Sequence, residues 1–247
     1  MLALPLAALL STLPPALDAW ALQACPPAKQ TPGSNVERKH MERERAECLR
    51  TAMDRAWDKT LRGLKRSRPE AEALREEHSR WVAGACAAVE EASWVDPTTG
   101  ERSMGTGYGF TESECLQRQY AWRGLLLDAW SRGHWPPLRP VLEAAAERAP
   151  GVRASLRSYQ ERARQTAARA AAPGAGGEEM PPRTLSREDW KSYLERLERT
   201  LSGADSLARR QCELTPEASE DCAPRLADEL VALMGFPETP GATRPRP

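Results

Sequence analysis

The chain has 247 residues, which is enough for one large helical domain, or for one domain with a smaller appendage. Lys and Arg total 35 and Asp and Glu also total 35, so no global field selects nucleic acid or a strongly charged substrate. Two Phe and four Tyr, beside abundant Ala, Leu, Arg and Glu, argue against a β-sandwich or barrel and favour an all-α protein.

Residues 1–21 have the pattern of a secretory signal peptide. An apolar run from Leu2 to Leu10 is followed by Pro14-Pro15 and by the small-x-small motif Ala19-Trp20-Ala21. No Lys or Arg precedes the run, which a misassigned start codon would explain; the alternative is a buried N-terminal helix. The stretch is too short and too interrupted by proline to span a bilayer. We therefore expect export to the periplasm or cell envelope.

Six cysteines follow this segment, without a CxxC pair or a neighbouring His that would complete a zinc site. In an oxidising compartment they would pair. The sequential pattern fits the helix layout below and joins Cys25 to Cys48, Cys86 to Cys115, and Cys212 to Cys222. Leu22-Gln23-Ala24-Cys25 also resembles a lipobox, so lipidation of Cys25 stays open as an alternative and as the one expected membrane contact.

Two helices are expected to form an antiparallel hairpin after the first cysteine. Ser34-Asn35-Val36-Glu37 is a capping-box pattern, and apolar residues at helical spacing predict a helix from about Val36 to Lys65. Ser67-Arg68-Pro69-Glu70 opens a second helix, which runs through Cys86 to Val89. Few residues separate the two helices, which favours a hairpin.

A loop and a third helix come next. Residues 93–110 are rich in Gly and Pro, and Thr111-Glu112-Ser113-Glu114 is expected to cap a helix that reaches Trp130. A bridge from Cys86 to Cys115 would close the loop between the second and third helices.

An Ala/Arg-rich region follows the break at 133–140, with helices expected at 141–149 and 152–171 and with Pro150-Gly151 between them. Residues 172–185 form a Gly/Pro linker and the best candidate domain boundary. The second of these helices is basic, which suits either contact with anionic lipid or wall polymer or a solvated face: Arg153, Arg157, Arg162, Arg164 and Arg169.

Residues 186–235 are expected to form a smaller C-terminal helical piece. One helix should span Ser186 to Leu201, and a last one should carry Leu226 to Met234. Its core is thin, so its cysteine pair would act as a staple. Residues 236–247 are Pro-rich and are predicted to be disordered. The sequence thus predicts a disulfide-stapled helical bundle with a smaller C-terminal extension.

The spacing of Trp81 and Cys86, then of Cys115-Leu116 and Arg123, resembles the LprI-type lysozyme-inhibitor family. The resemblance covers residues 25–130. It implies that residues 22–171 contain an exported all-α domain with disulfides 25–48 and 86–115, and for some members inhibition of lysozyme. The spacing between Cys25 and Cys48 is longer than usual for the family, and everything after Gly133 lies outside the match.

Arg102 and Tyr108 are the candidate partner-binding residues, because they lie in the loop that the Cys86–Cys115 bridge would close. An inhibitor of a muramidase must occlude a cleft that holds two carboxyl groups, and a constrained loop with Arg or Tyr could do so. The alternative is a solvent-exposed connection without a special role. Trp81 is expected in the core and Arg123 beside an acidic side chain, both with structural roles.

No pattern in the sequence indicates catalysis, a metal or a cofactor. His40, His78 and His134 stand alone, and the glycine-rich run 105–109 lacks the strand and the Lys-Ser/Thr ending of a phosphate loop. We therefore expect a binding protein and not an enzyme, with a protein partner such as lysozyme or a related muramidase. The alternative is a structural or scaffolding envelope protein, or a lipoprotein, without a lysozyme target.

Overall fold

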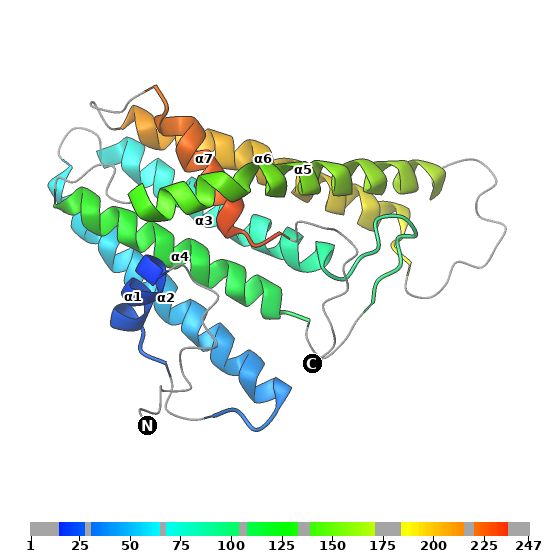
Figure 1. Ribbon diagram of the computed structural model, residues 1–247, viewed down its shortest axis with the longest axis horizontal. Coiled ribbons are helices and arrows are strands. Elements are labelled where there is room, and N and C mark those ends of the chain that lie inside the picture. The colour runs from blue at the N-terminus through cyan, green and yellow to red at the C-terminus, as the bar shows by residue number, and fades with distance from the viewer. Residues whose placement is uncertain are drawn as a thin grey trace.

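The computed structural model describes residues 15–27, 31–64, 68–103, 108–132, 139–170, 184–214 and 220–236. Seven helices occur in these residues (Figure 1): α1 Pro15–Ala24, α2 Asn35–Gly63, α3 Arg68–Ala92, α4 Phe110–Ser131, α5 Arg139–Ala170, α6 Arg187–Glu213 and α7 Cys222–Leu233. The extended pairings found in the described ranges are two isolated bridges, Val95 with Arg102 and Glu101 with Thr184. The all-α prediction is confirmed.

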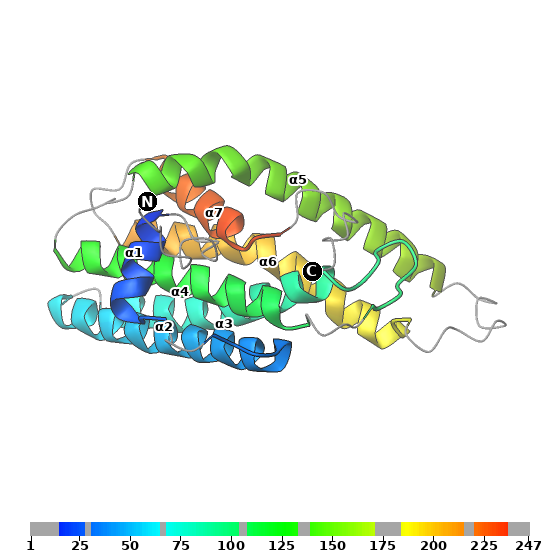
Figure 2. The ribbon, with the colours of Figure 1, turned by 60° about the horizontal axis from the view of Figure 1, so that its bottom comes forward.

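The helices form a layered bundle with α4 inside it. In Figure 2, α5 runs along the top and α2 along the bottom, with α4, α6 and α7 between them. Helix α4 packs against α1, α2, α3 and α7, while α6 packs against α3, α5 and α7. The predicted hairpin of the first two long helices is therefore a minor contact, because α2 lies mostly along α4. Arg75 on α3 still joins α2 through Asp54 and Asp58, each at 2.8 Å.

One hydrophobic core unites all seven helices. The cluster of buried side chains takes at least one residue from each helix: Leu17, Leu49, Leu74, Leu126, Tyr159, Leu197 and Leu230. The predicted C-terminal piece does not stand apart from the rest, because α6 and α7 share the core of the preceding helices. Most of the predicted linker lies outside the described residues, but Leu185 at its end is buried and donates its N–H to the carbonyl of Gly100 at 3.0 Å.

Helix α5 continues through Pro150, where the sequence predicted a break. Proline inside a helix costs about 3 kcal/mol, because it removes a hydrogen bond and crowds the preceding turn. The face formed by Ala149, Val152 and Leu156 is buried in the bundle, and this packing outweighs that cost.

Helix α6 runs to Glu213, well past the predicted end at Leu201. Gly203, which lies just beyond that predicted end, is inside the helix and has a packing role. A Cβ atom added at Gly203 would lie 2.3 Å from Cδ1 of Trp81. Glycine therefore lets α3 approach α6 closely.

A chain of hydroxyl groups joins the loop after α3 to the C-terminal helices. The Tyr193 hydroxyl donates to that of Tyr159 at 2.7 Å, and the Tyr159 hydroxyl donates to the carbonyl of Val95 at 2.9 Å. Phe236 packs edge-on against the Tyr159 ring, with 5.7 Å between centroids, and is buried. Phe236, the first residue of the predicted disordered tail, is therefore part of the core, and residues 237–247 lie outside the described residues.

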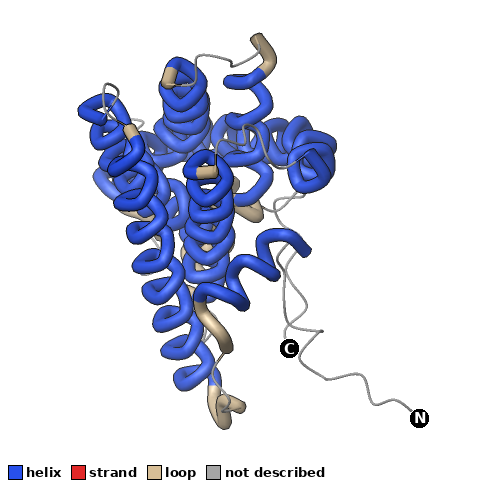
Figure 3. Tube along the Cα trace, turned by 90° about the vertical axis from the view of Figure 1, so that its left-hand side faces the viewer, coloured by secondary structure: helices blue, strands red, loops and turns tan. Residues whose placement is uncertain are grey.

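Helix α1 contains the last part of the predicted signal peptide, residues 15–21, and it packs against α2 and α4. In Figure 3 this short helix, nearest to the N-terminus, lies beside the long helices of the bundle. Residues 1–14 lie outside the described part of the chain. Within the parts of the chain given above, no helix combines the length and the apolar character needed to cross a membrane.

Candidate functional site

All three predicted disulfides are present. They join Cys25 to Cys48, Cys86 to Cys115 and Cys212 to Cys222, with Cα–Cα distances of 6.0, 5.5 and 5.9 Å. Cys86 and Cys115 are fully buried, so this bridge is part of the core. Lipidation of Cys25 would need the same sulfur that binds Cys48, so the two uses exclude each other.

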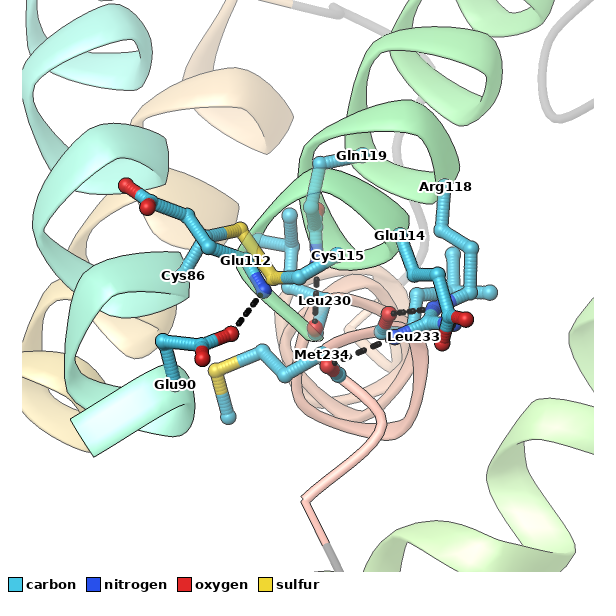
Figure 4. The surroundings of a disulfide bond; sticks show 10 residues. All are labelled: Cys86, Glu90, Glu112, Glu114, Cys115, Arg118, Gln119, Leu230, Leu233 and Met234. Atoms are coloured by element: carbon cyan, nitrogen blue, oxygen red, sulfur yellow. Dashed lines mark hydrogen bonds and ion pairs between the residues drawn. A yellow bond between two sulfur atoms is a disulfide. The ribbon is translucent and has the colours of Figure 1, made fainter. Parts of the chain in front are cut away.

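Glu90 holds the loop between α3 and α4 in place. One carboxylate oxygen accepts from the Trp94 indole at 2.6 Å and from the N–H of Gly109 at 2.5 Å. The other accepts from the N–H of Glu112 at 2.7 Å (Figure 4). These amides lie at the start of α4, where backbone N–H groups have no partner within the helix. A carboxylate there is stabilised by the hydrogen bonds and by the helix dipole.

The start of α4 therefore differs from the prediction that Thr111-Glu112-Ser113-Glu114 caps the helix. The N-cap residue is Gly109, whose φ of 95° falls in the left-handed region, and its cap comes from Glu90 on another helix. Glycine tolerates this φ because it has no Cβ atom.

Tyr108 lies in a cluster of cationic and aromatic side chains beside the start of α4. The Tyr108 ring lies 6.1 Å from the Trp94 ring, and Lys39 Nζ lies 5.8 Å from the Tyr108 centroid. The Arg38 guanidinium lies 5.0 Å from the centroid of Phe110. We call this surface the cation–aromatic patch, and it consists of Arg38, Lys39, Arg43, Trp94, Tyr108 and Phe110.

The basic side chains of the patch reach the surface. Arg38 and Arg43 are exposed and Lys39 is half-buried. In the ranges that the structure describes, no carboxylate forms an ion pair with any of the three. Glu112 is nearby, and its pKa is raised, first by burial and then by Glu90, while Arg43 and Lys39 act in the opposite direction. A ring beside cations that are not held in an ion pair can recognise an anionic group on a partner.

Arg102, the other predicted contact residue, does not join the patch. Its guanidinium donates to Glu91 at 2.6 Å, and the second oxygen of Glu91 accepts from Arg196 on α6. The Arg102 side chain is 35% exposed and Glu91 is 12% exposed. Arg102 therefore joins the loop to α6, and of the two candidates Tyr108 is the one that lies in the patch.

Trp81 and Arg123 lie inside the bundle. Trp81 is 8% exposed and its indole N–H donates to the Thr200 carbonyl at 2.9 Å. The Arg123 guanidinium is fully buried and donates to the amide oxygen of Gln211. The predicted carboxylate partner is replaced by this amide, while Glu229 acts on Arg123 through its electrostatic field.

Arg123 is the centre of a buried polar layer built from several helices. Its guanidinium lies 4.9 Å from the centroid of Trp122 and 5.8 Å from that of Trp57. The Trp122 indole donates to Glu229 at 2.8 Å. Burial lowers the pKa of Arg123 to about 9 and raises that of Glu229 to about 7. His78, also fully buried, has its pKa lowered by burial and by Arg123.

This layer is poorly suited to catalysis, because a reacting group must touch its substrate and these side chains are shielded from solvent. His40 instead lies exposed beside Glu44, at 3.1 Å, and His134 lies outside the described residues. No group of three or more metal-binding side chains occurs in the described ranges.

No family model, no curated protein and no solved structure matches this chain. The likeness to the LprI-type inhibitors thus remains a prediction from the spacing of cysteine and tryptophan.

Two of the five arginines on the basic face predicted on α5 form ion pairs with other helices. Arg153 pairs with Asp205 at 3.0 Å and with Asp228 at 2.8 Å, and Arg164 pairs with Glu198 at 2.8 Å. These pairs dock α5 on α6 and α7. Arg153 and Arg164 therefore have a structural role, and contact of α5 with anionic lipid or wall polymer stays a prediction.

Glu90 and Lys39 were not singled out from the sequence. A signal for Glu90 exists, since it lies four residues after Cys86 on the same helix and therefore on the same buried face. Lys39 carries no such signal, because its neighbour Tyr108 is 69 residues away in the chain. The fold brings the two together by laying α2 along α4.

Proposed function

We propose that this chain is an exported binding protein of the cell envelope, which contacts a protein partner through the cation–aromatic patch and catalyses no reaction. The three disulfides indicate an oxidising, non-cytoplasmic compartment. The observation that carries the proposal is the patch itself, where half-exposed Tyr108 and Phe110 lie beside basic side chains that form no ion pair within the described residues.

A muramidase such as lysozyme is the partner that we propose. Its cleft holds two carboxyl groups, which Lys39, Arg38 and Arg43 would complement in charge. Tyr108 would supply the ring that fills the cleft, since rigid aromatic side chains are frequent centres of interface energy. The Glu90 hydrogen bonds and the Cys86–Cys115 bridge support this contact by limiting the freedom of the loop before binding.

A turbidity assay tests the partner. Purified protein at stoichiometric excess should slow the clearing of a cell-wall suspension by lysozyme, and Tyr108→Ala and Lys39→Ala should each weaken inhibition, by roughly 30-fold for a central contact worth about 2 kcal/mol. Lys191→Ala is the matched control, because Lys191 is exposed on α6 outside the patch.

Unchanged clearing in the presence of the unmodified protein would exclude lysozyme as the partner. Pull-down from envelope extracts then tests the patch alone, including the alternative of a scaffolding protein. If the Tyr108→Ala and Lys39→Ala variants retain a partner as well as the unmodified protein does, the patch is excluded as the contact surface.

A further inference from the structure

Trp20 on α1 fits closely against the backbone of α4. A Cβ atom added at Gly124 would lie 2.2 Å from Cζ2 and 2.3 Å from Cη2 of the Trp20 ring. The indole N–H donates to Asp128, one turn further along α4, at 2.9 Å. Shape and hydrogen bonding therefore both match Trp20 to this position.

Other residues of α1 also pack closely against the bundle. Leu17 and Ala21 are fully buried in the common core, and Asp18 lies 3.9 Å from Arg45 of α2. The N–H of Cys25 donates to the carbonyl of Ala21 at 2.8 Å. The Cys25–Cys48 disulfide then ties the end of α1 to α2.

Gly124 supports the importance of this contact. Glycine inside a helix is less favourable than alanine, so its presence needs a reason. Gly124 lies well within α4, and the space that a side chain would fill there is taken by Trp20. Loss of Trp20 would remove that reason and leave the acceptor Asp128 without its indole donor.

We infer that residues 17–24 remain in the mature protein as the helix that covers α2 and α4, and that any leader is removed before Leu17. The small-x-small motif at Ala19-Trp20-Ala21 is then part of the fold and not the processing site. This inference does not depend on the partner or on the patch.

The N-terminus of the exported protein tests the inference directly. The full-length gene is expressed in a bacterial host that exports the product, and the purified protein is examined by intact mass and N-terminal sequencing. We expect the first residue to be Leu17 or to precede it. A first residue between Asp18 and Cys25 would overturn the inference, and a cut after Ala21 would do so most clearly.

The thermal stability of Gly124→Ala tests the contact by the sign of its effect. If Trp20 lies over Gly124, the added methyl group clashes with the indole and the Tm falls. If α1 is absent, the same change raises the Tm by about 1–4 °C, because alanine favours the helix. Gly84→Ala is the matched control, since an added Cβ at Gly84 in α3 meets nothing within 4 Å. Its Tm should rise in either case.

The double variant Trp20→Ala/Gly124→Ala separates this clash from a general defect. Relative to Trp20→Ala, the added alanine should raise the Tm as it does at Gly84. A Tm increase for the single Gly124→Ala equal to that of the control would overturn the inference. If Gly124→Ala does not fold, recovery of the double variant supports the contact, and loss of both variants contradicts it.

Discussion

Glu90 shows how one side chain can position both a loop and a helix. Its two carboxylate oxygens accept three hydrogen bonds, from the Trp94 indole and from the backbone of Gly109 and Glu112. The side chain is 2% exposed, so these bonds replace the water that it would otherwise bind. The position of Tyr108, directly before Gly109, depends on them.

Replacement of Glu90 by Gln should lower the free energy of unfolding by about 1–3 kcal/mol, because an amide cannot accept from the three donors as a carboxylate does. Urea denaturation under non-reducing conditions measures this loss. Glu101→Gln is the control, since Glu101 is exposed in the same loop. An equal midpoint for both variants would show that Glu90 does not hold the loop.

Glu229 should make stability fall as pH rises through the neutral range. Burial raises its pKa from 4.5 to about 7, opposed by the Trp122 indole, Arg225 and Arg123. A raised pKa means that the folded state holds the proton more tightly than the unfolded state. The stabilisation is therefore complete below about pH 4.5 and is lost as pH rises towards 7.

Buried His78 has the opposite effect on the pH dependence. Because its pKa is lowered in the folded state, the free energy of unfolding decreases as pH falls below 6.5. The comparison of Glu229→Gln with the unmodified protein separates the two. As pH rises from 4.5 to 8, we expect the free energy of unfolding of the variant to increase by up to about 3 kcal/mol relative to that of the unmodified protein. A difference that stays constant with pH would show that Glu229 does not titrate in this range.

Helix α7 is joined to α4 through its last carbonyl groups, which have no partner within a helix. Arg118 donates to the carbonyls of Leu233 at 2.8 Å and Met234 at 3.0 Å, and Gln119 donates to that of Leu230 at 2.9 Å (Figure 4). A planar guanidinium can reach two carbonyls at once and adds positive charge at the negative end of the helix dipole.

Arg118→Lys should therefore weaken the end of α7 although it keeps the charge. We expect a loss of about 1–2 kcal/mol and faster hydrogen exchange in the last turn of α7. Arg187→Lys, at an exposed position of α6, is the control. Unchanged exchange in α7 would mean that the two-carbonyl contact contributes little.

The elements that the sequence predicts best are those with a strong cap and an apolar stripe. Ser34 caps α2 as expected, with its hydroxyl accepting from the N–H of Glu37 at 3.2 Å. An error occurs where packing between distant helices overrides a local rule, as at Pro150 in α5. The buried position of α1 likewise depends on a distant residue, because the Trp20 ring packs over Gly124 of α4.

The candidate site was partly predictable for the same reason. The bridge from Cys86 to Cys115 singled out Tyr108 and Arg102 as residues of one loop, and their role in binding a partner stays a prediction. Whether a loop residue is free to contact a partner depends on the residues of other helices that lie next to it. Arg102 is occupied by Glu91, while Tyr108 meets Lys39 from α2, and neither contact can be inferred from local sequence.

At the scale of the whole molecule, the shared core predicts one cooperative unfolding transition. Residues before 171 and after 183 belong to the same hydrophobic cluster. Far-UV circular dichroism and tryptophan fluorescence should therefore give coincident urea curves in the oxidised protein. Two separate transitions would show that residues 186–235 unfold independently of the preceding helices.

The paired hydroxyls of Tyr159 and Tyr193 also have a spectroscopic consequence. Burial raises the pKa of both phenols above the ordinary value of 10.0, so the folded state favours their neutral form. The folded state is therefore destabilised in strong alkali, where both phenols must ionise. Their phenolate absorbance should appear together with the loss of helix signal and not before it. An ultraviolet titration with base would thus report the pH at which α5 and α6 separate from the loop after α3, which contains Val95.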